Sequence, residues 1–437
     1  MEYVSNTNRV NKLKNISMIL TFLFPLLLFI FIYPQDWFGI TIILGTTFYT
    51  LISKELRRSG KLLASVLLIL ITHHAIAIIN AYIAPTLGAD GDAIVFHNKA
   101  SAVAYFGDFS LLTNGSEFYT NFLAMFYSAF GDSYLLGMEL SVLAFFTSMI
   151  FLVKLLNLIG HTKHQHAVLL MYGLLPTCLM FTSITLRESW QMLFFILVVY
   201  SAVKLRKSKK ISCFFGLIGS MIGLSFWHNG FLAILPLLMF VTVLWAFNSK
   251  KKKSILFNFF GVIIGIILIA ISLKVIGSSS TSSASNALTS GNALEYVEQY
   301  RSNSKLDAGA SYVSEVSFSG PLGIILNMPL MFTGYMFAPF PWHVRGIMDI
   351  YALMESFFRF LLLVCAFKVW RKSKGEEKSI YGFLLFIFIL MELIWSLGTS
   401  NWGTAMRHHL VAYGVLLSIG GVRFSASIKR IMVAIFK

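Results

Sequence analysis

The residues of this sequence that could take part in chemistry are a few charged side chains and histidines at the ends of long apolar stretches. A charge at membrane depth costs at least about 2.5–3.5 kcal/mol on insertion scales, so such a residue usually has a partner or a function. The planar guanidinium of arginine presents several N–H donors whose geometry matches phosphate oxygens. A carboxylate can accept a proton from a sugar hydroxyl. The candidates are Arg187, Arg345 and Arg407, the acids Asp90, Asp92 and Glu188, and the histidines His97, His228 and His408.

Taken together, these side chains suit a lipid-linked phosphate or pyrophosphate at a membrane surface, because they map to one side of the expected topology. Taken singly, each has a structural alternative. Arg187 and Glu188 are neighbours that could simply pair with each other. Arg407 could anchor a helix at the interface, and His228 could form a structural hydrogen bond.

The same side chains do not form a clear metal or nucleotide site. Asp90-Gly-Asp92 with His97 could hold a hard cation, but two carboxylates are a weak signal. The three cysteines show no metal-ligand spacing, and neither a P-loop nor a dinucleotide fingerprint occurs. We therefore expect no metal and no cofactor, and we exclude a pump driven by its own ATPase domain.

The composition predicts a membrane protein. Of the 437 residues, 57% are hydrophobic and only 12% are charged, whereas about a quarter of a soluble domain is charged. Since a spanning helix needs about 20 mainly apolar residues, we predict an all-α polytopic protein, one integral membrane domain over residues 1–437 with about 12 transmembrane helices. These are expected at 17–33, 38–54, 62–83, 134–157, 166–183, 189–204, 211–227, 229–247, 254–276, 350–369, 379–397 and 405–422.

Lysine and arginine residues predict the orientation, because cytoplasmic connections are enriched in them. Basic stretches occupy every second connection and hold 27 of the 35 Lys and Arg residues, but only four of the 19 acidic residues. They lie at 2–14, 54–61, 154–163, 204–210, 250–253, 368–378 and 423–437. Both termini are therefore expected in the cytoplasm. The net charge of +16 follows from this topology, so nucleic acid is not an expected partner.

Two connections on the outer side are long, and one apolar segment does not fit the predicted topology. Residues 84–133 form a long loop that carries Asp90, Asp92 and His97, and residues 277–320 begin with a serine-rich run. Residues 321–340 are apolar but contain several prolines. We interpret this segment as a re-entrant or interfacial hairpin, with a thirteenth span as the alternative.

Four short motifs in this order resemble a known group of enzymes. They are Gly91-Asp-Ala-x-x-Phe-His97, Thr185-Leu-Arg-Glu188, Pro339-Phe-Pro-Trp342 and Gly403-Thr-Ala-x-Arg-His408. The pattern resembles multi-span proteins of bacterial surface-polysaccharide clusters, the O-antigen polymerase and GT-C glycosyltransferase superfamily. The similarity covers residues 60–425.

The resemblance implies glycosyl transfer at the outer face of the bacterial inner membrane, with a polyprenyl-linked sugar as donor. It implies a catalytic acid in the first large outer loop, which is Asp92 or Asp90 here, and Glu188 is a further catalytic candidate. The residues implied to bind the lipid phosphate are Arg187 and Arg407, with His408 and Arg345. Those expected to contact the substrate are His97, His228 and Trp342.

The function expected first is a polymerase of polyprenyl-pyrophosphate-linked repeat units, as in O-antigen, capsule or exopolysaccharide synthesis. Its partners would be the lipid bilayer, the lipid-linked glycan and a chain-length regulator. One alternative is a transferase that adds a single sugar from a polyprenyl-phosphate donor. Another is a flippase or other transporter of lipid-linked glycan, although we find no internal repeat. A further alternative is an acyltransferase of the bacterial cell envelope, which would use a histidine such as His97 as its base.

Overall fold

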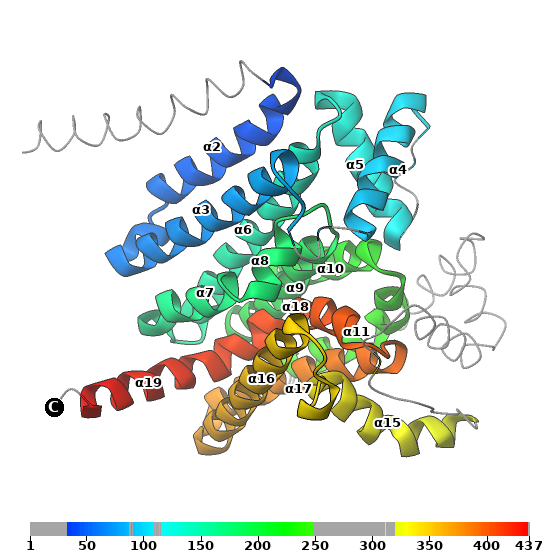
Figure 1. The fold of residues 1–437 in the computed structure, drawn as a ribbon. Coiled ribbons are helices and arrows are strands. Elements are labelled where there is room, and N and C mark those ends of the chain that lie inside the picture. The colour runs from blue at the N-terminus through cyan, green and yellow to red at the C-terminus, as the bar shows by residue number, and fades with distance from the viewer. Residues whose placement is uncertain are drawn as a thin grey trace, which may run out of the picture.

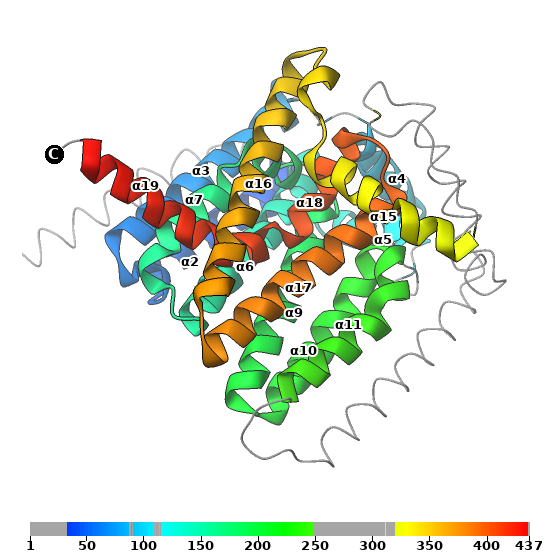
Figure 2. The same ribbon diagram turned by 90° about the horizontal axis from the view of Figure 1, so that it is seen from below.

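The structure is a computed structural model that describes residues 33–86, 89, 91–108, 110, 113, 115–247, 311 and 320–435. Within these ranges every regular element is a helix, and the one β-type contact is an isolated bridge between Ser311 and Asn401. The helices pack into a bundle in which elements from both halves of the chain lie side by side (Figure 1 and Figure 2). The predicted all-α class is confirmed. The expected spans 17–33 and 254–276, most of the segment 277–320 and Asp90 lie outside the described residues.

Six helices in the described ranges are long and apolar enough to cross a membrane. They are α3 (Gly60–Tyr82), α6 (Tyr134–Leu158), α9 (Glu188–Ser208), α16 (Ile347–Lys372), α17 (Gly375–Gly398) and the continuous unit Trp402–Arg430. In that unit, α18 (Trp402–Leu416) passes through a π-helical turn, η5 (Leu417–Gly421), into α19 (Val422–Ile435). The chain is thus a multi-pass α-helical membrane protein, but the twelve expected spans are not confirmed as a set.

Several of the other expected spans are shorter helices. The segment 38–54 forms α2 (Trp37–Ile52), which has 16 residues, and 211–227 forms α10 (Ile211–Trp227), which has 17. The segment 229–247 forms α11 (Asn229–Phe247). A helix of 16 or 17 residues is at or below the lower limit of about 17 needed to cross the hydrocarbon core.

The expected span 166–183 is broken. It forms α7 (Gln165–Gly173) and α8 (Pro176–Thr182), and the two helical pieces bend by 66°. The cause is Pro176, which has no backbone N–H and disfavours helical backbone at the residue before it. Accordingly, Leu175 is extended, with φ −60° and ψ 125°. If the bent pair is one span, the number of candidate spans among the described residues becomes seven.

The connection 84–133 contains two helices rather than one long loop. They are α4 (Asp92–Phe106) and α5 (Gly115–Phe130), which pack against each other at one edge of the bundle (Figure 1). Gly91 and Gly107 flank α4 with φ of +68° and +69°, values that glycine adopts without a Cβ penalty. The sequence predicts a loop here because residues 92–106 are too polar to span a membrane. They nevertheless form a helix, and the polar residue Asp92 is its first residue.

The segment 321–340 is mostly one helix and not a hairpin, while its re-entrant or interfacial position stays a prediction. Residues Gly320–Phe337 form one helix, α15, followed by the short 3-10 turn η4 (Pro341–His343). Proline is tolerated in the first turn of a helix and after its end, and Pro329 is the one proline inside α15. The four prolines therefore interrupt this segment less than their number suggests.

The described basic connections meet at one end of the bundle. Arg58 bonds Asn157 at 3.2 Å, and Arg206 bonds Glu376 at 2.6 Å. Further contacts join His161 to Tyr381 at 3.0 Å and His164 to Ser425 at 3.1 Å. The alternation of basic and non-basic connections in the sequence thus corresponds to two opposite ends of the bundle. Which end faces the cytoplasm stays a prediction from charge.

Two glycines allow close approach between elements. A Cβ at Gly420, in the π-helical turn, would overlap the backbone carbonyl of Leu362 in α16. A Cβ at Gly137 in α6 would overlap the Tyr127 hydroxyl and the Thr185 side chain. The absence of a side chain at Gly420 lets α16 pack closely against the last candidate span. The absence of a side chain at Gly137 lets Tyr127 of α5 and Thr185 of the α8–α9 connection both pack on α6. This second contact lies at the end of the bundle opposite the basic connections.

Candidate functional site

Arg407 bridges two carboxylates that come from distant parts of the chain. Its Nε and Nη2 atoms donate to Oε1 of Glu188 at 3.0 and 2.6 Å. Its Nη1 atom donates to Oδ2 of Asp92 at 2.7 Å. Arg407 lies in α18, whereas Glu188 and Asp92 are the first residues of α9 and α4. Three predicted site residues, separated by 219 and 315 positions, therefore meet at one point.

The two arms of the bridge differ in burial. The Glu188 side chain is 4% exposed and that of Asp92 is 61% exposed, with Arg407 at 20% between them. An exposed ion pair contributes only about 0–1 kcal/mol, so another anion can replace Asp92 at Nη1 at little cost. A buried carboxylate left alone is far more costly. Glu188 is therefore the fixed partner of Arg407, and Asp92 is the exchangeable one.

Both carboxylates also begin a helix. The N-terminus of a helix carries partial positive charge, which favours an acidic side chain in the first turn. This interaction favours the acidic residues Asp92 and Glu188 in the first turns of α4 and α9. The ends of the two helices and the first half of α18 then enclose the Arg407 guanidinium.

Aromatic rings form a wall next to this bridge. His408 stacks on Trp395 of α17, with centroids 4.0 Å apart and planes at 19°. Its Nδ1 atom lies 2.9 Å from the Thr399 hydroxyl. His228, in the turn between α10 and α11, meets Trp395 edge-on at 4.6 Å and His408 at 6.3 Å. These rings pack against one another, and Trp395 at their centre is only 8% exposed.

His228 is a neutral imidazole in this surrounding. Its Nδ1 atom accepts a hydrogen bond from the backbone N–H of Gly230 at 3.0 Å. Burial lowers the pKa of His228 well below its ordinary value, and the nearby charge of Arg187 lowers it further. Since Nδ1 accepts, the proton sits on Nε2. The structure thus supports both the hydrogen-bonding alternative for His228 and its place in the predicted cluster.

Arg187 lies in the short connection between α8 and α9, next to the bridge. The Ser141 hydroxyl of α6 donates to the carbonyl of Leu186 at 3.2 Å and so fixes this connection. The charge of Arg187 acts on His228 and His408, which places it beside the aromatic wall. Glu188 bonds Arg407, so this carboxylate has a partner other than its neighbour Arg187. The direct pairing of Arg187 with Glu188 stays a prediction.

Buried hydroxyl groups surround the same connection. Within the described part of the chain, Ser183, Thr185 and Ser189 have side-chain oxygens without a hydrogen-bond partner, and so does Oε2 of Glu188. All four side chains are nearly inaccessible. Buried polar atoms are rarely left unpaired in native proteins, so each such atom calls for water or a ligand. Buried polar atoms are therefore concentrated at the start of α9.

His97 belongs to a neighbouring network and not to the Arg407 bridge. Its Nδ1 atom lies 3.0 Å from the Tyr127 hydroxyl, its Nε2 atom lies 3.7 Å from Oδ1 of Asp132, and its ring stacks on Tyr134 at 3.6 Å. Burial lowers the pKa of His97, and Asp132 opposes this effect. Through Tyr127, which meets Thr185 at Gly137, the network touches the α8–α9 connection. Asp132 is a site candidate that sequence reasoning missed.

Two predicted residues lie apart from the bridge. The Trp342 side chain is 76% exposed and stacks on Phe340 at 5.0 Å. Arg345 is exposed, and its backbone N–H donates to Oδ2 of Asp349 at 3.0 Å. Asp349 in turn accepts from Trp402 Nε1 at 2.9 Å, so the turn before α16 packs on the start of α18. The structure does not bring the Arg345 side chain to Arg407.

Sequence reasoning also missed two carboxylate–histidine pairs deep in the bundle. His409 Nδ1 contacts Oε2 of Glu392, and its Nε2 lies 3.1 Å from the carbonyl of Tyr335. A carbonyl oxygen only accepts, so Nε2 carries a proton, and one further proton lies between Nδ1 and Glu392. His74 likewise pairs with Glu139 at 2.7 Å. The one feature of the sequence that points to these pairs is the presence of acids and histidines inside apolar stretches.

Comparison with known protein families, with curated proteins and with solved structures finds no match to this chain. Among the described residues, no group of three or more His, Cys, Asp or Glu side chains could hold a metal ion. What the fold and the site define is therefore a multi-pass α-helical membrane protein. It has a carboxylate–arginine–carboxylate bridge and an aromatic wall at one end, and its described basic connections lie at the other.

Proposed function

We propose that this protein is a polymerase of polyprenyl-pyrophosphate-linked oligosaccharide repeat units at the outer face of a bacterial inner membrane. The observation that carries the proposal is the Arg407 bridge, in which a guanidinium lies beside a solvent-facing carboxylate at one end of an apolar bundle. Transfer of a lipid-linked sugar needs a cation for the leaving pyrophosphate and a base for the acceptor hydroxyl. Arg407 and Asp92 are these two groups.

The donor in this proposal is the growing chain on its polyprenyl pyrophosphate. A pyrophosphate oxygen takes the place of Asp92 at Nη1 of Arg407, and Arg187 adds positive charge from the α8–α9 connection. The bond between the anomeric carbon and the pyrophosphate oxygen breaks, and the oxygen keeps the electron pair. The guanidinium groups stabilise the charge that develops on it. Lipid pyrophosphate then leaves.

The acceptor is a sugar hydroxyl on a new lipid-linked repeat unit. Its oxygen attacks the anomeric carbon, and its proton passes to the carboxylate of Asp92, which the donor has released from Arg407. Glu188 is a positioning residue, because it is nearly buried and holds the guanidinium through two hydrogen bonds. The sugar rings pack on the wall of Trp395, His408 and His228.

The proposed orientation follows the charge distribution. The basic end of the bundle faces the cytoplasm, with both termini, and the bridge faces the outer side. The lipid-linked substrates reach the bridge from the bilayer, and a chain-length regulator is a further proposed partner.

Two other functions fit particular observations. A transferase that adds one sugar from a polyprenyl-phosphate donor would use the same bridge, because a monophosphate also fits one guanidinium fork. A transporter of lipid-linked glycan is favoured by the buried pairs Glu392–His409 and Glu139–His74, since ionisable residues at membrane depth often mark transport pathways.

The proposal is tested by a gel of surface polysaccharide from a strain that lacks the gene, with and without a plasmid copy. We expect a long ladder with the wild-type copy and a single repeat unit without it. A ladder that stays intact with a small change in mass would indicate the single-sugar transferase. An unchanged polysaccharide would contradict both enzymatic functions.

A further inference from the structure

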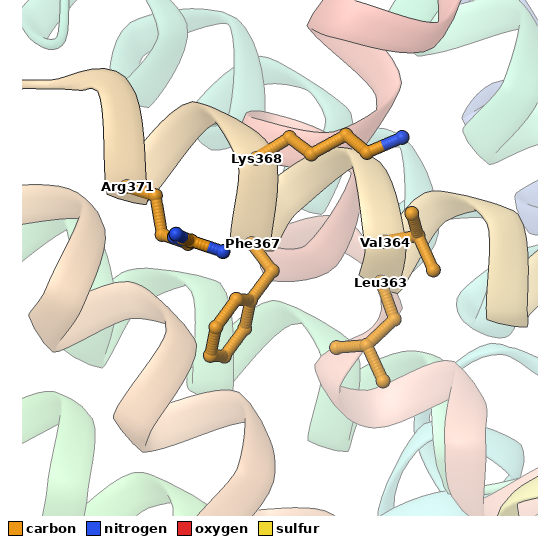
Figure 3. Close-up of a pocket in the computed structure, with 5 residues that line it drawn as sticks. All are labelled: Leu363, Val364, Phe367, Lys368 and Arg371. Atoms are coloured by element: carbon orange, nitrogen blue, oxygen red, sulfur yellow. The ribbon is translucent and has the colours of Figure 1, made fainter.

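A groove on α16 lies at the basic end of the bundle, away from the Arg407 bridge. It has a volume of about 340 Å³. Its lining comes from helix α16 alone, as Figure 3 shows, and consists of Leu363, Val364, Phe367, Lys368 and Arg371. Residues at these spacings are neighbours on a helix surface. The groove therefore combines three apolar side chains with two basic ones.

The groove opens toward the membrane. Only 33% of the apolar window of α16 is buried, against 44–83% for the other candidate spans among the described helices. The Phe367 side chain is 46% exposed, and Lys368 and Arg371 are exposed as well. Helix α16 thus offers a lipid-facing surface with two cations at one end.

These cations lack counter-charges within the described part of the chain. Lys368 and Arg371 form no ion pair there, and Arg423 of α19 acts together with Lys368 on the nearby Cys365. The acid Glu376, which starts the next helix, is bonded to Arg206 at 2.6 Å. Glu377 beside it forms no ion pair with Lys368 or Arg371 among the described residues. The basic side chains of this end outnumber the two acids, so the local charge is positive beside an apolar surface.

We infer that this groove binds an anionic phospholipid. The headgroup phosphate contacts Lys368 and Arg371, and one acyl chain lies along Leu363, Val364 and Phe367. Basic pockets at the cytoplasmic ends of spanning helices attract anionic headgroups, whereas the ammonium group of a zwitterionic lipid lowers that attraction. The inference does not depend on the proposed glycosyl transfer, because the groove and the Arg407 bridge lie at opposite ends of the bundle.

The test uses the purified full-length protein and vesicles of phosphatidylglycerol or phosphatidylethanolamine, with lipid retention measured by native mass spectrometry. The test variant is Lys368→Ala with Arg371→Ala. The control is Lys54→Ala with Arg57→Ala, which removes the same charge from exposed positions at the same end. We expect about 30-fold weaker retention of phosphatidylglycerol in the test variant and little change in the control. The swap Lys368→Arg with Arg371→Lys should keep the binding.

Three results would overturn the inference. Equal loss in both double variants would mean diffuse attraction to a charged surface. Equal retention of the two phospholipids by the wild type would remove the anionic selectivity. Retention of polyprenyl phosphate, but not phosphatidylglycerol, would assign the groove to a lipid-linked substrate instead. Thermal unfolding of all variants shows that the exposed substitutions leave the fold intact.

Discussion

Removal of the Arg407 side chain leaves two carboxylates in very different surroundings. Glu188 is 4% exposed and loses two hydrogen bonds, whereas Asp92 is 61% exposed and remains hydrated. Breaking a buried ion pair costs about 3–5 kcal/mol, and breaking an exposed one costs about 0.2–1 kcal/mol. We therefore expect Arg407→Met to lower the free energy of unfolding by about 3 kcal/mol, mainly through Glu188.

A double-mutant cycle separates the two arms of the bridge. Combining Arg407→Met with Glu188→Gln removes the stranded buried charge, so the double variant should be more stable than Arg407→Met alone. The expected coupling energy is about 3 kcal/mol for this pair. For Arg407→Met with Asp92→Asn it should be below about 1 kcal/mol, because water screens the exposed pair.

The assay is unfolding of the purified protein in mixed micelles, followed by circular dichroism, with Lys99→Ala on α4 as the control. Lys99 is exposed and lies outside the bridge, so its replacement should leave the stability unchanged. Equal coupling energies for the two arms would refute the assignment of Glu188 as the fixed partner. A coupling energy near zero for Glu188 would contradict the bridge itself.

Further predictions concern the rest of the structure. His409→Leu should destabilise the protein by about 3–5 kcal/mol because it strands the buried Glu392, and adding Glu392→Leu should restore much of the loss in the same unfolding assay. Gly420→Ala should cost about 1–3 kcal/mol, because its Cβ overlaps the backbone of Leu362; an unchanged unfolding midpoint would contradict this close crossing. Burial lowers the pKa of His161 to about 4, so its contribution to stability should be fully present above about pH 6.5 and decline as the pH falls toward 4. Melting temperatures of the wild type and of His161→Gln across this range should therefore converge at low pH.

The apolar helices and the clustering of the basic connections could be predicted from the sequence. Apolar length and the alternation of Lys and Arg are local properties, and helices such as α3, α6 and α17 follow from them directly. The break at Pro176 and the continuous helix α15 were harder to predict from the sequence. Pro176 begins a new helix, whereas α15 continues through Pro329, and the sequence alone does not tell which proline ends a helix.

Which side chains meet in the site depends on the directions in which they point from their helices, and the sequence alone does not give these directions. Consecutive residues of a helix point about 100° apart. Arg407, His408 and His409 consequently reach three different partners: Glu188 with Asp92, Trp395 with Thr399, and Glu392. Spacing identified Arg407, His408, Asp92 and Glu188 as candidates, but it could not show that one arginine joins both acids. Asp132 was missed because its role depends on the packing of α4 against α5.

We propose that Asp92 and Arg407 carry out glycosyl transfer between lipid-linked repeat units. The most direct measurement is the product ladder formed by purified protein in proteoliposomes that contain lipid-linked repeat units as both donor and acceptor. We expect a long ladder from the wild type and from Asp108→Asn, which removes another exposed acid close to α4, and single repeat units from Asp92→Asn. A ladder of normal length from Asp92→Asn, or no ladder from the wild type, would contradict this proposal.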